Sequence, residues 1–402
     1  MLYKKVPIFE SIWIECLGDT GRFLIAIVDH GLDLREKWKR DSQQWFSMAS
    51  DRAPETGRLY HHLGAIAYPN VLEQLFYYSK SLCVSVPFLN SRDSITKLFS
   101  QHVNSFPMRP KDTNAAFLCA HYILFSGKNR KDLEYLVQSF VGHLDGHFNT
   151  GNEINNDRWL VSGYQIGITL GCAMLEYGSA SNLIVRWIKL EKDGDNQHDD
   201  SNTFSASQNF LDAIDFAART HNVVLRRSGD PNFYPYLHVT LSFLHHMSKF
   251  TMAMDYIEAK MPWKLISLML NTLLEKCASV DSIESEDFPR PSNGAPRPLP
   301  EDFAQRGLLW VDRYYPDDWF TFKLDDDEKY LEVPSMTEER QDRCLWLGCR
   351  LASSGKWITY DKSARQFGVP SQYDIEIPSV NAETPMQPES GLQTPTNAVA
   401  AQ

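Results

Sequence analysis

The feature that most constrains the fold is the spacing of apolar residues between about residue 9 and residue 280. Segments of roughly 12 to 20 residues carry apolar side chains at three- and four-residue intervals, which is the period of an amphipathic helix. Residues 12–28, for example, place Trp13, Leu17, Leu24 and Val28 on one stripe. The alternation of period two that marks strands is rare. The sequence therefore predicts an all-α fold.

Two early segments repeat a short pattern that we expect to be structural. The residues that carry it are Trp13, Leu17 and Gly18 in the first copy and Tyr60, Leu63 and Gly64 in the second. Each copy is followed by an aromatic-x-x-small step and a proline, and the two prolines, Pro54 and Pro87, are 33 residues apart. The period of tetratricopeptide (TPR) repeats, which are helical pairs, is close to this spacing. The pattern predicts stacked antiparallel helix pairs, an α-solenoid in which large aromatic side chains pack against small residues.

Changes in composition divide the chain into five parts. We expect a first helical module, a longer helical array with an acidic loop at 191–202, a proline-rich linker, an aromatic-rich helical cap that packs back on the array, and a disordered tail. The predicted boundaries are 1–100, 101–280, 281–300, 301–370 and 371–402. The tail is too poor in apolar residues to fold by itself.

Charge, cysteines and hydropathy restrict the classes of function. The net charge of −11 argues against a broad electrostatic grip on nucleic acid, which depends on lysine and arginine, but leaves room for one local basic groove. The seven cysteines are scattered and odd in number, which favours reduced thiols in the nucleus or cytoplasm. Gly163, Gly167 and Gly171 recur every four residues in the longest apolar segment, and we expect close helix packing there, with no membrane partner.

Signatures of catalysis are weak along the whole sequence. No Walker loop and no GxSxG motif occur. His143 and His147 have the i, i+4 spacing of a zinc-binding pair, but no third ligand lies nearby in the sequence. The acidic runs near residues 317 and 325 are typical of solvated loops. We therefore expect a non-enzymatic protein that has no cofactor and no metal site.

One arginine stands apart in the stretch "GDTGRFLIAI", residues 18–27. Helical geometry places Arg22 on the same side as Glu15 and Asp19, where an i, i+3 ion pair with Asp19 is the simple interpretation. The second repeat offers another one. Arg58 lies in the corresponding helix, with His61 following at i+3, so that Arg22 and Arg58 could face one groove suited to phosphate binding.

Several long segments resemble a known family. They are "WIECLGDTGRFLIAI", "WFSMASDRAPETGRLYHHLGAIAYPNVLEQLFYYSKSLCVSVPF", "SRDSITKLF", "PEDFAQRGLLWVDRYYP" and "RCLWLGCRLASSGKWITYD". Together they cover most of residues 8–368 and are similar to the Est-type DNA/RNA-binding domain of telomerase-associated Est proteins and of Smg adaptors in mRNA surveillance. The resemblance implies a 14-3-3-like, TPR-type helical module followed by a helical array.

The resemblance also implies roles for two residues. Arg22 matches the arginine of the "GD-x-x-R-Y" helix that binds phosphoserine in 14-3-3 proteins, and Phe23 stands where the tyrosine would be. By its spacing, His61 is the best match to the asparagine that holds the peptide backbone in those proteins. Arg58, which the repeat pattern places on the same groove, would add a second guanidinium. The sequence departs from the family in two ways. Helices that usually precede this start are missing, so we expect a truncated module or an incomplete pocket. No PIN nuclease segment follows, so we expect no nuclease activity.

Three functions remain open from the sequence. The first is an adaptor in nonsense-mediated mRNA decay that binds a phosphorylated protein, which by resemblance is the surveillance RNA helicase. The second is a telomerase-associated subunit that binds RNA or telomeric single-stranded DNA. The third is a degenerate scaffold without the phosphate site. The negative net charge favours a protein partner, and the name of the family's domain favours nucleic acid.

Overall fold

The computed structural model describes residues 7–27, 32–103, 108–149, 153–193, 205–277, 279–291, 297–321, 329 and 331–377. The part of the chain that it describes is almost entirely helical, as the sequence predicts. The first eight helices are α1 (Glu10–Ile27), α2 (Leu32–Arg52), α3 (Gly57–Ile66), α4 (Val71–Leu82), α5 (Ser91–His102), α6 (Thr113–Ser126), α7 (Leu133–Asn149) and α8 (Glu153–Met174). The remaining helices are α9 (Leu183–Asp193), α10 (Gln208–Val224), α11 (Tyr234–Met247), α12 (Thr251–Ile257), α13 (Trp263–Leu274), α14 (Asp281–Glu284), α15 (Pro300–Gln305) and α16 (Pro334–Ala352).

Local capping explains where several of these helices begin and end. Asn70 accepts a hydrogen bond from the backbone N–H of Glu73 and so starts α4, as expected of an N-cap asparagine. Asp112 starts α6 in the same way, through the N–H of Ala115 at 2.8 Å. Gly127 ends α6 with a φ of 68°, a left-handed conformation that glycine adopts without strain.

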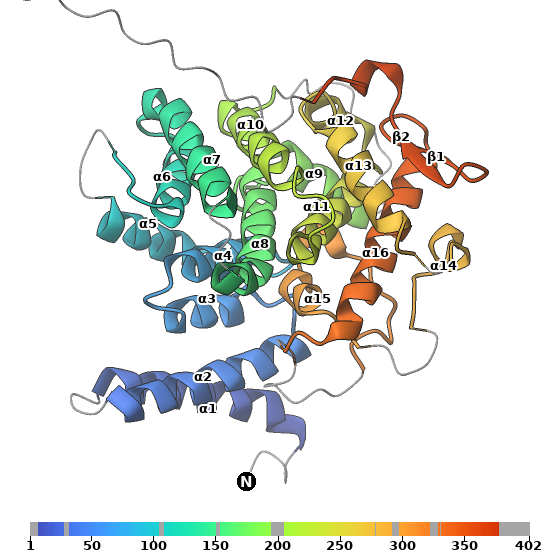
Figure 1. Ribbon diagram of the computed structural model, residues 1–402. Helices are drawn as coiled ribbons and strands as arrows, with labels where there is room; N and C mark the ends of the chain where they lie inside the picture. Colours follow the sequence, from blue (N-terminus) through green and yellow to red (C-terminus); the bar gives the residue numbers. More distant parts are fainter. Residues whose placement is uncertain are drawn as a thin grey trace, which may run out of the picture.

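The two predicted repeats form two helical hairpins, α1–α2 and α3–α4, at the lower left of Figure 1. In the first hairpin a Cβ on Gly18 would lie 2.9 Å from the ring of Phe46. In the second a Cβ on Gly64 would lie 2.7 Å from the ring of Tyr78. In both units, a glycine on the first helix thus lets an aromatic ring of the second helix approach closely. This explains why the glycine and the aromatic residue recur together.

The central array is built around α8, which packs against α4, α10 and α11. Two of its regularly spaced glycines make close helix packing possible. A Cβ on Gly167 would come within 2.6 Å of Val239 on α11, and one on Gly171 within 3.2 Å of the ring of Trp310. The nearest neighbour of the third, Gly163, is Trp159 of its own helix.

In the structure, the C-terminal segment packs against the central array. Helix α16 lies along α11 and α13 (Figure 1). It is followed by a two-stranded antiparallel sheet of β1 (Thr359–Asp361) and β2 (Gln366–Gly368), in which Tyr360 pairs with Phe367. Strand β2 rests on α13, where the side chain of Asn271 holds both the N–H and the C=O of Phe367.

The structure places parts of the predicted linkers and tail. Helix α9 runs to Asp193, so the acidic loop begins inside a helix, and the rest of that loop lies outside the described residues. Helix α14 occupies the start of the proline-rich linker. The first seven residues of the predicted tail are ordered against the core, with the ring of Tyr373 6.2 Å from that of Trp263. Residues 378–402 lie outside the described part.

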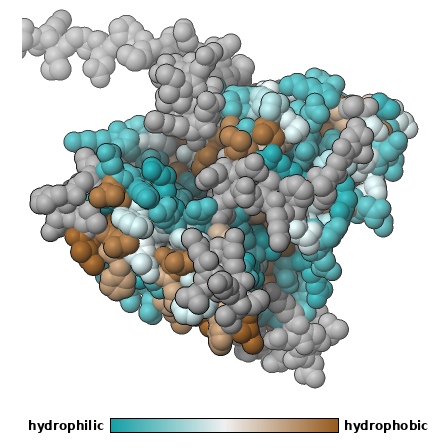
Figure 2. Space-filling model, turned by 90° about the horizontal axis from the view of Figure 1, so that it is seen from below, coloured by the Kyte–Doolittle hydropathy of each residue, from teal (hydrophilic) through white to brown (hydrophobic). Residues whose placement is uncertain are grey.

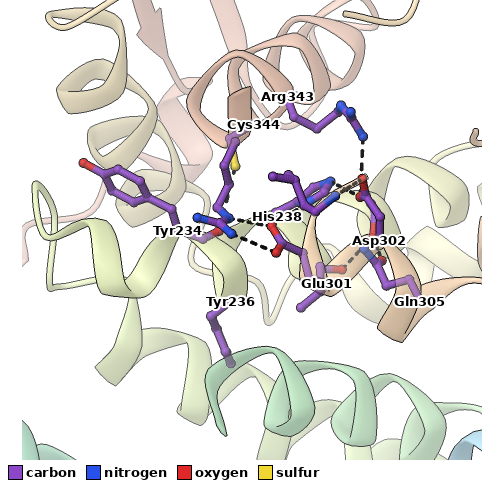
Figure 3. A network of polar contacts seen from close by, with 12 residues as sticks. Tyr234, Tyr236, His238, Glu301, Asp302, Gln305, Arg343 and Cys344 are labelled. Atoms are coloured by element: carbon purple, nitrogen blue, oxygen red, sulfur yellow. Dashed lines mark hydrogen bonds and ion pairs between the residues drawn. The ribbon is translucent and has the colours of Figure 1, made fainter. Parts of the chain in front are cut away.

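A buried network of charged groups fastens α15 and α16 to α11 (Figure 3). Glu301 accepts hydrogen bonds from Arg340 at 2.6 and 3.0 Å, and its Oε1 lies 3.0 Å from Nδ1 of His238. Asp302 lies 3.6 Å from Nη1 of Arg343. All five side chains are at least 98% buried. Burial alone raises the pKa of Glu301, but Arg340 and His238 outweigh burial and hold that pKa below its usual value.

The other end of α15 contacts the N-terminal hairpins. The ammonium of Lys80, on α4, is buried and donates to the backbone oxygens of Phe303 and Ala304 at 3.2 and 2.7 Å. It also lies 4.1 Å from the ring centroid of Tyr60. Carbonyl groups at a helix C-terminus attract cations. Burial lowers the pKa of Lys80 well below its usual value.

The network gives a testable prediction for stability. Arg340→Met leaves the Glu301 carboxylate buried without its main counter-charge, so we expect a loss of about 3–5 kcal/mol in the free energy of unfolding. Urea denaturation followed by circular dichroism measures it. Adding Glu301→Gln should recover part of the loss. A cost no larger than that of Arg290→Met, whose pair with Asp318 is exposed, would contradict the prediction.

Candidate binding surfaces

The three predicted phosphate-binding residues lie along the line where α1 meets α3. We call this line the α1–α3 seam. Its charged and ionisable residues are Glu15, Asp19 and Arg22 on α1 and Arg58, His61 and His62 on α3.

Arg22 makes the ion pair that helical geometry predicts. Its Nη2 lies 3.1 Å from Oδ1 of Asp19, one turn earlier on α1, and the two side chains are 40% and 39% exposed. An i, i+3 pair of this kind stabilises a helix by a few tenths of a kcal/mol. The guanidinium of Arg22 therefore remains accessible to a stronger anion.

Arg58 makes a different contact, because it reaches across from α3 to α1. Its guanidinium binds both carboxylate oxygens of Glu15, one of them at 3.1 Å, and its side chain is 47% exposed. Each arginine of the seam is thus held by a carboxylate of α1. A phosphate group would have to replace these carboxylates.

Two histidines lie beneath the arginines. The Nε2 of His61 lies 2.9 Å from the hydroxyl oxygen of Ser94, and the ring of His62 stacks on Phe46 with centroids 4.6 Å apart. Neither Nδ1 has a hydrogen-bond partner among the residues that the structure describes. Burial and then the charge of Arg22 lower both histidine pKa values, that of His62 to about 4. The charge of Arg22 thus reaches both rings, and the structure brings the predicted residues to one place.

The predicted repeat residues differ in burial between the two copies. Tyr60, Leu63 and Gly64 are buried, as is Gly18. Leu17 is half-buried, whereas Trp13 is 42% exposed. The neighbouring Ile14 is fully buried and takes the core position of the first hairpin. If the two glycines are superposed, Ile14 corresponds to Tyr60, which explains the one-residue offset between the copies.

A group of basic residues beside the start of α7 was not predicted from the sequence. The guanidinium of Arg109 lies 4.8 Å from the ring centroid of Tyr135, which is 45% exposed. Lys111, Lys128 and Lys131 are exposed and make no ion pair with any residue that the structure describes. We call these four cations and Tyr135 the basic edge. Residues 92–131 hold seven lysines and arginines against two aspartates, a local charge reversal that could have revealed it.

An open groove of about 570 Å³ adjoins the basic edge, between α7 and α10. Its cations are already paired across the groove: Arg130 with Asp212, Arg219 with Glu134 and Lys260 with Asp215. Hydrogen bonds from Arg219 help to lower the pKa of Glu134 to about 2. Because each cation faces a carboxylate, the groove walls are less suited to a phosphate backbone than the basic edge is.

The described part of the chain shows neither a cluster of metal ligands nor a helix fit to cross a membrane. No group of three histidine, cysteine or acidic side chains is placed to hold a metal ion among the residues described. His143 contacts Ser139 at 3.4 Å, and the side chain of His147 lies outside the described part. None of the described helices has the length and hydropathy needed to cross a membrane.

The position of Arg22 at the seam predicts a shift in the titration of His62. Arg22→Gln removes one cause of the low pKa, so the pKa of His62 should rise above about 4 but stay below 6.5, because burial remains. Histidine NMR titration, with the signal assigned through His62→Gln, measures this. Arg52→Gln is the control, since Arg52 pairs with Glu10 instead. An unchanged pKa would place Arg22 away from the histidine.

Comparison with known proteins gives a family profile and solved structures of similar fold. The profile of the Est1 DNA/RNA binding domain matches residues 42–314. A crystal structure of Est1 and Cdc13 has a similar fold, with a TM-score of 0.57 and 13% sequence identity over 89% of this chain and 71% of that chain. Curated protein sequences gave no match. Since the matched profile spans well over half of the residues, the chain belongs to the Est1 DNA/RNA-binding domain family.

Proposed function

We propose that this chain is a non-enzymatic, telomerase-associated subunit that acts in the nucleus and binds RNA or telomeric single-stranded DNA. Membership of the Est1 DNA/RNA-binding domain family, over residues 42–314, is the observation that carries the proposal. The solved structure of similar fold is that of Est1 and Cdc13. We further propose that the chain binds a protein partner similar to Cdc13.

The basic edge supports nucleic acid as the ligand. Proteins that bind single strands combine cations along the backbone with aromatic side chains on which bases stack. Tyr135 is an exposed ring that Arg109 already covers, with Lys128 and Lys131 in the connection just before α7. The negative net charge of the whole chain restricts phosphate contacts to such local positions. We therefore expect few phosphate contacts and strong salt dependence.

This proposal is tested by anisotropy titrations of labelled telomeric single-stranded DNA and RNA at several salt concentrations. Arg109→Glu should weaken binding and reduce the slope of log K against log salt by about 1. Tyr135→Ala should cost about 1–3 kcal/mol, because stacking is lost.

Lys356→Glu serves as the matched control for Arg109→Glu. It reverses an exposed cation that also lies beside an aromatic ring, that of Trp357, next to β1 and away from α7. Binding that is absent in the wild type, or that Lys356→Glu weakens as much as Arg109→Glu, would contradict the proposal.

A second candidate function rests on the α1–α3 seam. Arg22 and Arg58 both present accessible guanidinium groups on this seam. A pair of arginines suits bidentate binding of a phosphate. A phosphoserine adaptor in nonsense-mediated mRNA decay would use this site for a phosphorylated protein such as the surveillance helicase. It would then act in the cytoplasm as well. The competing Asp19 and Glu15 carboxylates make this the weaker candidate.

Phosphoserine peptides and their unphosphorylated twins test the second candidate. If the seam binds phosphate, Arg22→Glu should abolish the preference for the phosphorylated peptides with little effect on unfolding, because Arg22 lies at the surface. Arg52→Glu is a matched control, since its side chain is 37% exposed and also pairs with a carboxylate of α1. Equal affinity of wild type for the twins would reject the phosphate site.

A further inference from the structure

The outward face of α1, together with the short 3-10 turn before it (Pro7–Phe9), carries a stripe of exposed apolar side chains. We call it the α1 stripe, and it consists of Ile8, Phe9, Ile12, Trp13, Phe23 and Ile27, which are 42–83% exposed. Seen from below, apolar side chains gather at this edge of the molecule (Figure 2). Exposed apolar residues are ordinary when scattered, but apolar residues gathered on one side of a helix mark an interaction surface. Here they form two groups on the same side, at residues 8–13 and 23–27, with Cys16 and Thr20 between them.

The stripe has no cover among the described residues because α1 packs through its opposite side. The residues of α1 that are fully buried are Ile14, Gly18 and Gly21, and Gly18 and Gly21 approach Phe46 and Ser42 of α2. At 100° per residue, the stripe falls on the side of α1 that faces away from α2. Helix α1 forms the lower edge of the molecule in Figure 1.

The exposed area is large enough for a specific interface. An aromatic side chain presents roughly 150–250 Å², and an isoleucine somewhat less. With the observed fractions, the stripe exposes about 700 Å², close to the ~800 Å² that each partner contributes to a standard interface. The area therefore fits one helix-sized partner surface.

The order of large and small residues along the stripe is symmetric about position 18. Bulky residues lie towards both ends, and the small residues Cys16 and Thr20 lie on either side of the centre, on the outward face. A two-fold axis there would pair Phe9 with Ile27, Trp13 with Phe23, and Cys16 with Thr20. Small residues at a crossing point let two helices approach closely, and a two-fold interface must be complementary to itself.

We propose that the α1 stripe binds a second copy of this chain, with the two α1 helices antiparallel and meeting most closely at Cys16 and Thr20. The charges of α1 are compatible with this partner. Glu10, Glu15 and Asp19 pair with Arg52, Arg58 and Arg22 of the same chain, so no unpaired like charges of α1 oppose association. The interface is independent of the proposed nucleic-acid function, since it uses no residue of the basic edge.

Sedimentation equilibrium of the full chain across micromolar concentrations tests the proposal. We expect a dimer whose dissociation constant Phe23→Glu raises by about tenfold or more, because a charge replaces a buried ring. Leu89→Glu is the matched control, since Leu89 is also 66% exposed but lies outside the stripe. A chain that stays monomeric throughout, or a dimer that Phe23→Glu leaves unchanged, would overturn it. Another occupant of the stripe, such as a different protein, would give the monomeric result.

A cross-linking experiment tests the antiparallel geometry. Helices 8–10 Å apart bring facing Cα atoms within disulfide range, so Thr20→Cys should form a disulfide to Cys16 of the second copy, which is exposed, when copper phenanthroline is added as oxidant. The same substitution in a Cys16→Ser background should give no such dimer. Cross-linking of the unaltered chain through Cys16 alone would indicate a parallel arrangement and overturn the proposal.

Discussion

The buried charges at the two ends of α15 hold the molecule together. At its start, Glu301 and Asp302 meet arginines of α16 and His238 of α11. At its end, backbone oxygens receive the buried ammonium of Lys80 from α4. Buried polar and charged groups are costly unless counter-charges or hydrogen-bond partners satisfy them, so these contacts fix the C-terminal segment against both the central array and the N-terminal hairpins. The segment that looks like a cap in the sequence is therefore the central connection of the fold.

The chain directly after α15 extends this connection to the second hairpin. Gly307, at a φ of 86°, lies against the backbone oxygen of Pro54, where any side chain would collide. The next residues pair with the end of α4, through Leu309 and Cys83. Because α3 and α4 are fixed in this way, the α1–α3 seam has one rigid wall. The other wall is α1, which packs on its hairpin partner α2 and reaches α3 through the seam contacts.

The α1–α3 seam, the α7–α10 groove and the basic edge differ mainly in whether their arginines and lysines already have carboxylate partners. At the seam and in the α7–α10 groove, cations face carboxylates of the same chain, so a new anion must compete with an existing partner. At the basic edge, lysines have no such partner among the described residues, and an aromatic ring lies beside Arg109. In a chain of net charge −11, the basic edge thus combines lysines that have no carboxylate partner with an exposed aromatic ring, which suits limited and salt-sensitive contact with nucleic acid.

The sequence by itself determined the helical class, the repeat of the two hairpins and the family, because helical periodicity, glycine–aromatic packing and family motifs are all local patterns. It also predicted the ion pair of Arg22 with Asp19, which depends only on helical geometry. The tertiary structure alone decided that Arg58 binds Glu15, that Glu301 meets Arg340, and that Arg109 covers Tyr135. These pairs join residues that are 26 to 43 positions apart, and no local pattern specifies which of many charged residues will meet once the helices pack.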